Sequence, residues 1–232
     1  MISNGLGPYG LLAQAAGETL YMVFWTFLLT FVLGTALGVL LFLTTPGSVV
    51  VERIRSAGAQ RAVIVGHHVA SVLVNIVRSL PFVILLLAIL PLTRSIVGTT
   101  LGTTAALVPL TVSMFPFFAR IVDNALAEVD TGRLDAAEAM GASTRQLVWR
   151  VLLPESRSGL IAGSTLTLVA IVGNTAVAGT VGAGGLGAYA VTYGYQRYDD
   201  QLMWTTVLVL VVIVQAIQVV GDVWLRRRLH KR

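Results

Sequence analysis

The sequence predicts an all-α integral membrane protein with five transmembrane helices in a single domain. Of its 232 residues, 56% are hydrophobic and 12% are charged, whereas soluble domains carry roughly 25% charged residues. Several apolar stretches reach about 20 residues, the length that an α-helix needs to cross the hydrocarbon of a bilayer. They are residues 20–43, 69–90, 101–121, 160–181 and 202–225, and no long linker or fixed repeat separates them.

Each stretch reads as a membrane helix despite local interruptions. The first contains no charged residue, the second contains only Arg78, and the fifth contains only Asp222, near its end. The third is apolar up to Arg120 but includes two prolines, and the fourth is rich in Ala, Gly and Thr. Few charges in so much apolar sequence are typical of helices that contact lipid.

Two pairs of glycines with three residues between them lie in or beside the first and fourth stretches. They are Gly34 with Gly38 and Gly159 with Gly163. Such pairs let helix backbones approach closely in a membrane. The pattern fits contacts within one chain or between two copies, and the sequence does not choose between them.

The positive residues predict the orientation of the chain, because cytoplasmic loops carry an excess of Lys and Arg. Positive residues are concentrated in the loop after the first stretch, the loop after the third stretch and the C-terminal tail. The loops after the second and fourth stretches hold only Arg94 and Arg197. The N-terminus is therefore expected outside and the C-terminus inside, and this clustering between apolar runs does not resemble a nucleic-acid surface. The cytoplasmic charges are Arg53, Arg55 and Arg61; Arg133, Arg145, Arg150 and Arg157; and Arg226, Arg227, Arg228, Lys231 and Arg232.

The cytoplasmic segment 131–156 is predicted to form two short helices. Asp130 or Thr131 can cap the first, and Gly141 suits a left-handed C-terminal cap. Ser143 then opens the second, with a Gln three residues later that completes a capping box. Pro154 is expected to end this second helix.

An amphipathic hairpin lying on lipid is the alternative interpretation of this segment. Its small residues offer no bulky anchor for the headgroup region, and its carboxylates would be repelled by anionic lipid. Small side chains instead permit close approach by another protein. These residues are Ala136, Ala137, Ala139 and Gly141, with the acids Asp135 and Glu138.

The order Asp-Ala-Ala, three residues, Gly, nine residues, Val-Leu-Leu-Pro resembles the EAA loop of ABC importer permeases. The family pattern is Glu-Ala-Ala, three, Gly, nine, Ile, any, Leu-Pro, so Asp135 and Val151 are conservative departures. In that family the loop docks into a groove on a cytoplasmic ATPase subunit. The resemblance assigns ATPase coupling to Asp135, Ala136, Ala137, Glu138, Gly141, Leu153 and Pro154.

The segments "NIVRSLPFVILLLAILPLTRSIVGT", "AALVPLTVSMFPFFARIVDNAL", "VGAGGLG" and "YGYQRYD" extend the resemblance to methionine-type ABC importer permeases. This implies a homodimer in the bacterial inner membrane, two cytoplasmic ATPase subunits and an extracytoplasmic substrate-binding lipoprotein. Alternating access would move the substrate. ATP and Mg would bind the ATPase partner, so the permease itself has no cofactor and is not an enzyme. Methionine rests on resemblance alone, and another amino acid or small solute is the alternative.

Arg78, with Asn75, Ser79 and Pro81, lies within the second apolar stretch. An ionisable group in a membrane helix costs roughly 2.5–3.5 kcal/mol on insertion scales and usually faces the protein interior. These residues can line the substrate path, near a substrate carboxylate. Alternatively, Arg78 is a structural residue that binds the carbonyls of a neighbouring helix.

The fourth stretch and the glycines after it offer further candidates for the path. Asn174 is expected to face a polar partner, and Val177 belongs to an apolar constriction at the outer end. Residues 182–187 match G-x-G-x-x-G, but a dinucleotide site needs a preceding strand in a βαβ unit. We therefore expect a turn at an outer gate or docking surface there.

An aromatic segment between the fourth and fifth stretches contains Tyr193, Tyr195, Arg197 and Tyr198. It can contact the binding protein or form an interfacial aromatic belt. No metal site is expected, because the chain has no cysteine and the adjacent pair at 67 and 68 points its imidazoles to different helix faces.

Two other function classes fit the sequence less well. An intramembrane hydrolase would need H-E-x-x-H, paired carboxylates or a serine beside a base, and Asp222 stands alone in its stretch. A passive channel would not need an EAA-type loop.

Overall fold

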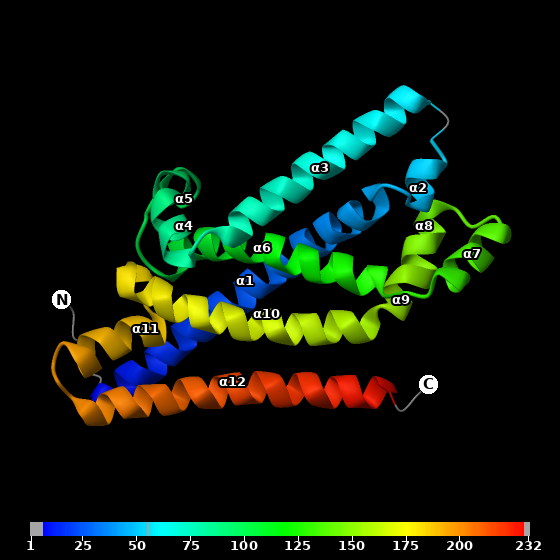
Figure 1. Cartoon of the computed structure of the whole chain (residues 1–232). Coiled ribbons are helices and arrows are strands. Elements are labelled where there is room, and N and C mark those ends of the chain that lie inside the picture. The colour runs from blue at the N-terminus through cyan, green and yellow to red at the C-terminus, as the bar shows by residue number, and fades with distance from the viewer. Residues whose placement is uncertain (1–6, 55, 230–232) are drawn as a thin grey trace. The chain divides into compact units, whose positions relative to one another are not determined.

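The computed structural model describes residues 7–54 and 56–229, and the regular elements in that part of the chain are helices (Figure 1). Among the described residues, 5 helices are long and apolar enough to cross a membrane. The all-helical class with five long apolar helices is therefore confirmed. These helices are α1 (Pro8–Thr44), α3 (Ala57–Ser79), α6 (Thr103–Ala127), α10 (Arg157–Ala178) and α12 (Asp200–Leu229).

Shorter helices connect the long ones. Three of them, labelled η, have the wider π-helical hydrogen-bond pattern. In chain order the short elements are α2 (Val49–Glu52), α4 (Phe82–Ala88), α5 (Leu90–Val97), α7 (Thr131–Ala139), α8 (Thr144–Gln146), η1 (Leu147–Leu152), α9 (Leu153–Glu155), η2 (Gly179–Ala183), α11 (Gly185–Tyr189) and η3 (Ala190–Tyr195).

The chain divides into two compact units. Four of the long helices, α1, α6, α10 and α12, contribute residues to both units, whereas α3 lies wholly in unit 2. Each unit is described by itself below. Unit 1 comprises Met1–Leu29, Leu80–Met114 and Thr165–Val220, and unit 2 comprises Thr30–Ser79, Phe115–Ser164 and Gly221–Arg232.

The second long helix differs from its expected bounds of 69–90. Helix α3 begins at Ala57 and ends at Ser79, and Pro81 precedes the separate helix α4. A proline disfavours the helical conformation of the residue before it, so the helix is interrupted at Leu80. The polar residues in the first half of α3 hid its true beginning from a reading based on hydrophobicity.

The core of unit 2 joins the C-terminal end of α6 to the helices that follow it. A nine-residue buried cluster runs along one face of α6 and continues under α7 and η1. In Figure 1, α7, α8 and α9 accordingly lie beside the end of α6. The cluster consists of Phe118, Val122, Leu126, Val129, Leu134, Ala137, Leu147, Val148 and Leu152.

Both glycine pairs contact α6 within unit 2. Gly34 and Gly38 bring α1 against α6, and Gly159 and Gly163 bring α10 against it. A side chain at these positions would collide with α6; at Gly38, a Cβ would lie 2.5 Å from the carbonyl oxygen of Ala119. The sequence left open whether these glycines serve contacts within one chain or between two copies. In the structure, they make contacts within one chain.

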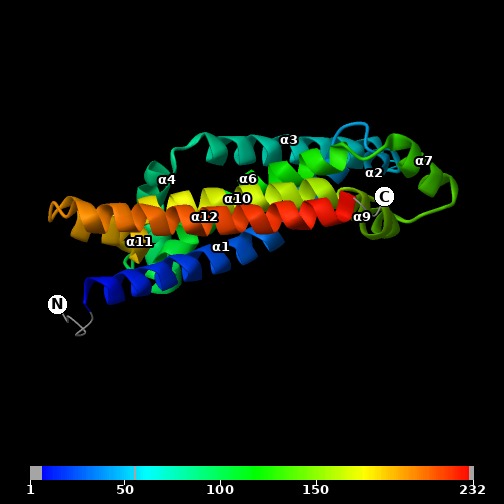
Figure 2. The same cartoon turned by 90° about the horizontal axis from the view of Figure 1, so that it is seen from below.

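Unit 1 contains a cluster that orders the segment after α10. Leu186 and Tyr189 of α11 are buried with Leu12 and Ala15 of α1, and apolar residues of α12 pack against them. Helix α11 therefore lies beside the first part of α12 in both views (Figures 1 and 2).

Three of the charges used to predict orientation, Arg55, Lys231 and Arg232, lie outside the described residues.

Candidate functional site

The predicted coupling segment begins with a capped helix. The side chain of Asp130 accepts a hydrogen bond from the backbone N–H of Gly132 at 2.9 Å. Asp130, rather than the alternative Thr131, is therefore the N-cap of α7. This bond satisfies one of the free N–H groups that every helix start exposes.

Gly141 ends α7 in the left-handed conformation that the sequence predicted, with φ of +78°. Its N–H donates to the carbonyl oxygen of Glu138 at 2.7 Å, and the N–H of Ala142 donates to that of Ala137 at 3.1 Å. This pair of bonds is a Schellman motif, which closes the last turn of a helix. The direction of the chain after α7 is thus fixed by backbone geometry.

The second helix of the segment begins with the predicted capping box. The Ser143 hydroxyl accepts from the N–H of Gln146 at 3.3 Å, and the Gln146 side chain accepts from the N–H of Ser143 at 2.8 Å. The predicted end at Pro154 differs from the structure. Pro154 lies in the first turn of α9, and the helix continues to Glu155 before its C-cap at Ser156. A proline near a helix start removes no bond that the helix needs, and η1 supplies the wider turn before it.

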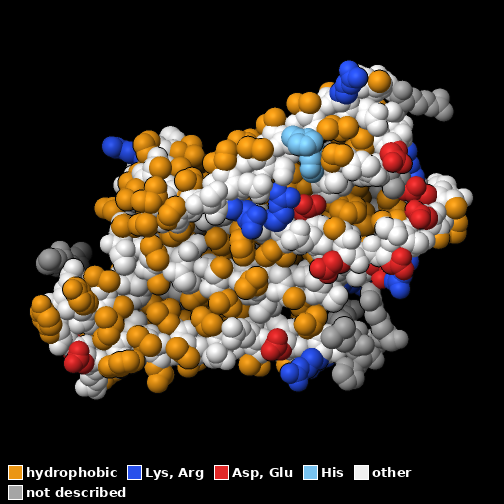
Figure 3. Space-filling view, viewed as in Figure 1, with side chains coloured by type: hydrophobic (Ala, Val, Ile, Leu, Met, Phe, Trp, Pro, Cys, Tyr) orange, Lys and Arg blue, Asp and Glu red, His pale blue; other side chains and the backbone are white. Residues whose placement is uncertain are grey.

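The two sides of α7 have different surroundings. Leu134 and Ala137 are buried in the cluster of unit 2, whereas Asp135, Ala136 and Gly141 are exposed. The small size of Ala137 therefore serves packing against η1 and not the outer surface. Figure 3 shows acidic side chains gathered at the end of unit 2 that contains α2 and α7.

Two large apolar side chains stand on the same segment. Met140 is 82% exposed and Trp149 is 67% exposed. Sequence reasoning did not select either, although a Met directly before the predicted Gly cap and a Trp among arginines are visible signals. Exposed Met and Trp are enriched where one protein binds another.

Three polar contacts brace the segment. Arg133 forms an ion pair with Glu155, which joins α7 to α9. Arg53 lies 3.9 Å from Glu138 and donates to the carbonyl oxygen of Ala142 at 3.2 Å. Exposed ion pairs add little stability, so these contacts mainly fix orientation.

The predicted substrate-path residues fall in both units. In unit 2, the Ser79 hydroxyl donates to the backbone carbonyl of Asn75 at 2.6 Å, so it serves its own helix. Arg78 is exposed in the last turn of α3, where a positive charge interacts favourably with the helix dipole.

In unit 1, Pro81 is the N-cap of α4 and Asn174 Nδ2 lies 3.9 Å from the Met114 sulfur. Val177 is 37% exposed. The candidate residues therefore do not gather into one site within either unit.

The glycine-rich turn of unit 1 is held by α1, a contact that sequence reasoning missed. The Glu18 carboxylate accepts from the N–H of Gly185 at 2.7 Å, and the Thr19 hydroxyl accepts from that of Leu186 at 2.9 Å. The N–H group of Gly185, which would have to bind a nucleotide phosphate, thus donates to a carboxylate of the chain itself. This contact agrees with the expectation that the G-x-G-x-x-G match is not a dinucleotide site.

The aromatic segment combines packed and exposed tyrosines. Tyr193 stacks on Tyr189 at 4.7 Å, and the Arg197 guanidinium lies 4.6 Å from the Tyr193 ring centre. Tyr195 and Tyr198 are 70% and 90% exposed. Burial, followed by the nearby Tyr193, raises the pKa of Tyr189 above 10.0, so its hydroxyl stays protonated and donates to the Pro8 carbonyl at 2.9 Å.

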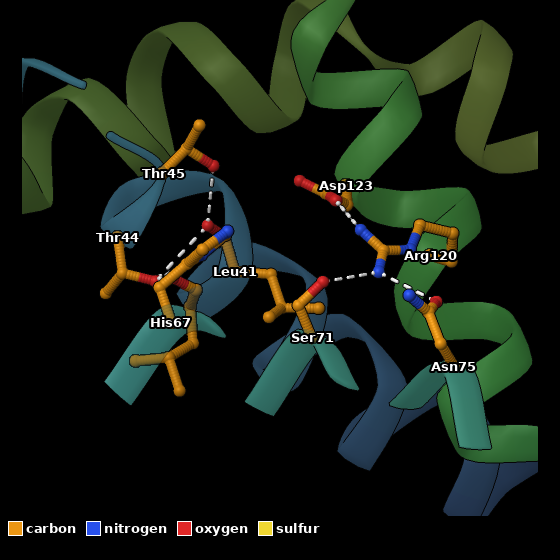
Figure 4. A network of polar contacts seen from close by, with 9 residues as sticks. Leu41, Thr44, Thr45, His67, Ser71, Asn75, Arg120 and Asp123 are labelled. Atoms are coloured by element: carbon orange, nitrogen blue, oxygen red, sulfur yellow. Dashed lines mark hydrogen bonds and ion pairs between the residues drawn. The ribbon is translucent and has the colours of Figure 1, made fainter. Parts of the chain in front are cut away.

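A polar network in unit 2 was also missed (Figure 4). Arg120 contacts Asp123 of its own helix and reaches Ser71 and Asn75 of α3. In the sequence, Arg120 is visible only as the charge near the end of the third apolar stretch. A signal was available, because His67, Ser71, Asn75 and Ser79 recur every four residues on one helix face.

Arg120 also lines a cavity of about 640 Å³ in unit 2, beneath α7. Acidic residues of α2, α6 and α7 face the cavity together with Arg120 and His67. No three His, Asp or Glu side chains within residues 7–54 and 56–229 are placed to hold a metal ion.

Five long apolar helices and a rigid polar segment define a multi-pass, all-helical membrane protein. The family described as "Binding-protein-dependent transport system inner membrane component" matches residues 54–231. The chain therefore belongs to this family and is a multi-pass permease component of the inner membrane, not an ATPase.

Relatives and a solved structure agree over nearly the whole chain. The probable D-methionine transport system permease protein MetI of Vibrio cholerae is 46% identical, with 95% of this chain and 93% of that protein covered. The methionine import system permease protein MetP of Bacillus subtilis is 43% identical, with 90% and 89% covered. A chain of the structure "Inward facing conformations of the MetNI methionine ABC transporter" has a TM-score of 0.88 and 43% identity, with 98% and 99% covered.

Proposed function

We propose that this chain is the permease subunit of an ABC importer for methionine, in which two copies form the path and two ATPase subunits drive alternating access. The observation that carries the proposal is the similarity over nearly the full length to permeases of methionine systems. In this proposal the two units act together as one transmembrane domain, because four long helices run through both.

The segment 131–156 is the proposed coupling surface on the cytoplasmic side. It presents Asp135, Ala136, Gly141 and, half-buried, Glu138, while Leu153 packs against the buried cluster of unit 2 and Pro154 lies in α9. The caps and ion pairs described above make it rigid. Rigidity supports the coupling role, because a flexible segment would change its own conformation when the ATPase subunit moves and would not transmit the movement to the transmembrane helices. The N-terminus would lie outside and the C-terminus inside.

The test is reconstitution of the purified permease with its ATPase subunit in proteoliposomes. A methionine-loaded binding protein is expected to stimulate ATP hydrolysis severalfold and to drive uphill methionine uptake. If a binding protein loaded with another amino acid does so instead, the methionine assignment is wrong. Uphill uptake without any ATPase subunit would overturn the permease mechanism itself.

The same vesicles test the orientation. The chain contains no cysteine, so a cysteine introduced at the exposed Met140 is the single reactive thiol. A membrane-impermeant thiol reagent is expected to reach it from the cytoplasmic face. Reaction from the external face would exclude the proposed coupling surface.

Asn75, Arg78, Ser79, Pro81, Asn174 and Val177 remain proposed path residues. Arg78 gives the sharpest test, because a guanidinium can attract a substrate carboxylate. We expect Arg78→Ala to slow methionine uptake about tenfold, with ATP hydrolysis still stimulated by the binding protein, while Arg78→Lys retains most uptake. Normal uptake by Arg78→Ala would favour the structural role at the end of α3.

The aromatic segment is the proposed contact for the extracytoplasmic binding protein. Tyr195, Arg197 and Tyr198 are exposed, and Tyr and Arg are enriched at interfaces. Tyr193 supports them from the stacked position beside Tyr189.

A further inference from the structure

Helix α3 buries little of its apolar surface in unit 2. Only 6% of the most apolar part of α3 is buried. Among the described residues of α3, Val74 is buried. Hydrophobic side chains along α3 are visible at the surface in Figure 3. Its inward face instead carries His67, Ser71 and Asn75, each four residues from the next, and all three hydrogen-bond to neighbouring helices (Figure 4).

Arg120 makes two of those contacts at once. One terminal nitrogen, Nη2, donates to the Ser71 hydroxyl at 2.9 Å and to Asn75 Oδ1 at 3.1 Å. The other, Nη1, donates to Asp123 Oδ2 at 2.9 Å. The side chains of Arg120 and Asp123 are only 21% and 14% exposed. An arginine bound through both nitrogens has a fixed direction that a lysine cannot reproduce.

The face of α6 opposite Arg120 packs against the proposed coupling segment 131–156. Phe118, Val122 and Leu126 share the buried cluster with residues of α7 and η1. The inner end of α6 therefore forms one packed body with segment 131–156. Arg120 lies between Phe118 and Val122 in sequence and projects from this body to α3.

We propose that Arg120, held by Asp123, is a positioning residue that makes α3 follow the coupling surface when the ATPase subunits move it. This inference rests on the proposed function. Close packing resists continuous deformation, so a displaced α6 carries Arg120 with it. Since α3 has few apolar contacts, the bonds to Ser71 and Asn75 are the route by which it is pulled.

The test measures methionine imported per ATP hydrolysed in the reconstituted complex. Arg120→Gln is expected to retain ATP hydrolysis within twofold of wild type but to lower this ratio at least tenfold. Ser71→Ala removes one of the acceptors on α3, changes no residue of α6 and lies outside the proposed path residues, and it is expected to lower the ratio in the same direction. The Arg120→Gln/Ser71→Ala double variant should have an import ratio no lower than that of Arg120→Gln alone, since both changes break the same contact between α6 and α3.

A structural reading of the same residues predicts a different outcome. If Arg120 only stabilised the fold, both variants would lower assembly and hydrolysis together and leave the ratio unchanged. Arg61→Gln, at an exposed arginine of α3 outside the network, is the matched control and should leave both quantities unchanged.

Spin labels give a direct readout of the movement. Cysteines introduced at Val69 of α3 and at Glu128, after α6, take labels uniquely because the chain has no cysteine. In the wild type their separation should stay constant through the ATP cycle, whereas in Arg120→Gln it should vary or broaden. An unchanged import ratio and an unchanged label separation in Arg120→Gln would overturn the inference. Loss of coupled hydrolysis in the wild type would instead overturn the proposed function.

Discussion

Replacement of Gly141 by tryptophan is expected to abolish ATP-driven uptake while the protein still inserts into the membrane. Gly141 has φ of +78°, a conformation that costs other residues roughly 1–2 kcal/mol. A Cβ there would meet no atom of the described residues within 4 Å. The position is therefore open at its Cβ, and an indole there would project from the surface on which a partner is proposed to dock, while the strained turn misdirects α8.

The expected loss is large because alternating access needs strong mechanical engagement. Shifting a two-state equilibrium from 1:99 to 99:1 takes about 5.5 kcal/mol of differential binding. A partner that cannot seat on the segment cannot supply that difference. We expect uptake to fall at least a hundredfold in Gly141→Trp, with ATPase co-purification lost. Gly141→Asn should retain both, because asparagine tolerates the left-handed conformation.

Gly98 provides a matched control within the chain. It ends α5 in the left-handed conformation, with φ of +82°, and a Cβ there would likewise meet no described atom within 4 Å. Gly98→Trp therefore carries the same backbone cost outside segment 131–156. If Gly98→Trp abolished co-purification as fully as Gly141→Trp, or if Gly141→Trp transported normally, the proposed docking role would be wrong.

Local signals in the sequence predicted the helix caps of segment 131–156 well. Gly141 has the predicted positive φ, and Ser143 forms the predicted capping box. Both features depend on residues within a few positions of one another, so a sequence can specify them without its tertiary fold. The number of long apolar helices was predictable for a similar reason, because the length needed to cross a bilayer is a property of each stretch alone.

Features that depend on distant partners were not predictable in this way. Hydrophobicity placed the second span too late, because the first half of α3 carries polar residues such as His67, whose hydrogen-bond partner Thr44 lies on another helix. The partner of Asn75 lies 45 residues away. The candidate path residues were chosen by residue type, and residue type does not say which helix face meets which neighbour.

Replacement of Gly38 by leucine is expected to destabilise unit 2. A Cβ at Gly38 would lie 2.5 Å from the Ala119 carbonyl oxygen and 2.6 Å from the Val122 Cβ. The first obstacle is backbone and cannot rotate away, so α1 must move off α6. Overpacking a close-packed site typically costs about 1–3 kcal/mol, occasionally more, and here it also disturbs the cluster that includes Val122 and supports the coupling surface.

Gly66 separates this packing effect from the general effect of adding a leucine to a membrane helix. It lies within α3 of the same unit, and a Cβ there would meet nothing within 4 Å. Gly66→Leu should fold at least as well as wild type, because leucine has the higher helix propensity by up to about 1 kcal/mol. Size-exclusion profiles and thermal unfolding in detergent report the difference. Gly38→Leu should aggregate or melt several degrees lower, and a monodisperse Gly38→Leu protein with wild-type melting would show that α1 and α6 do not need their close approach.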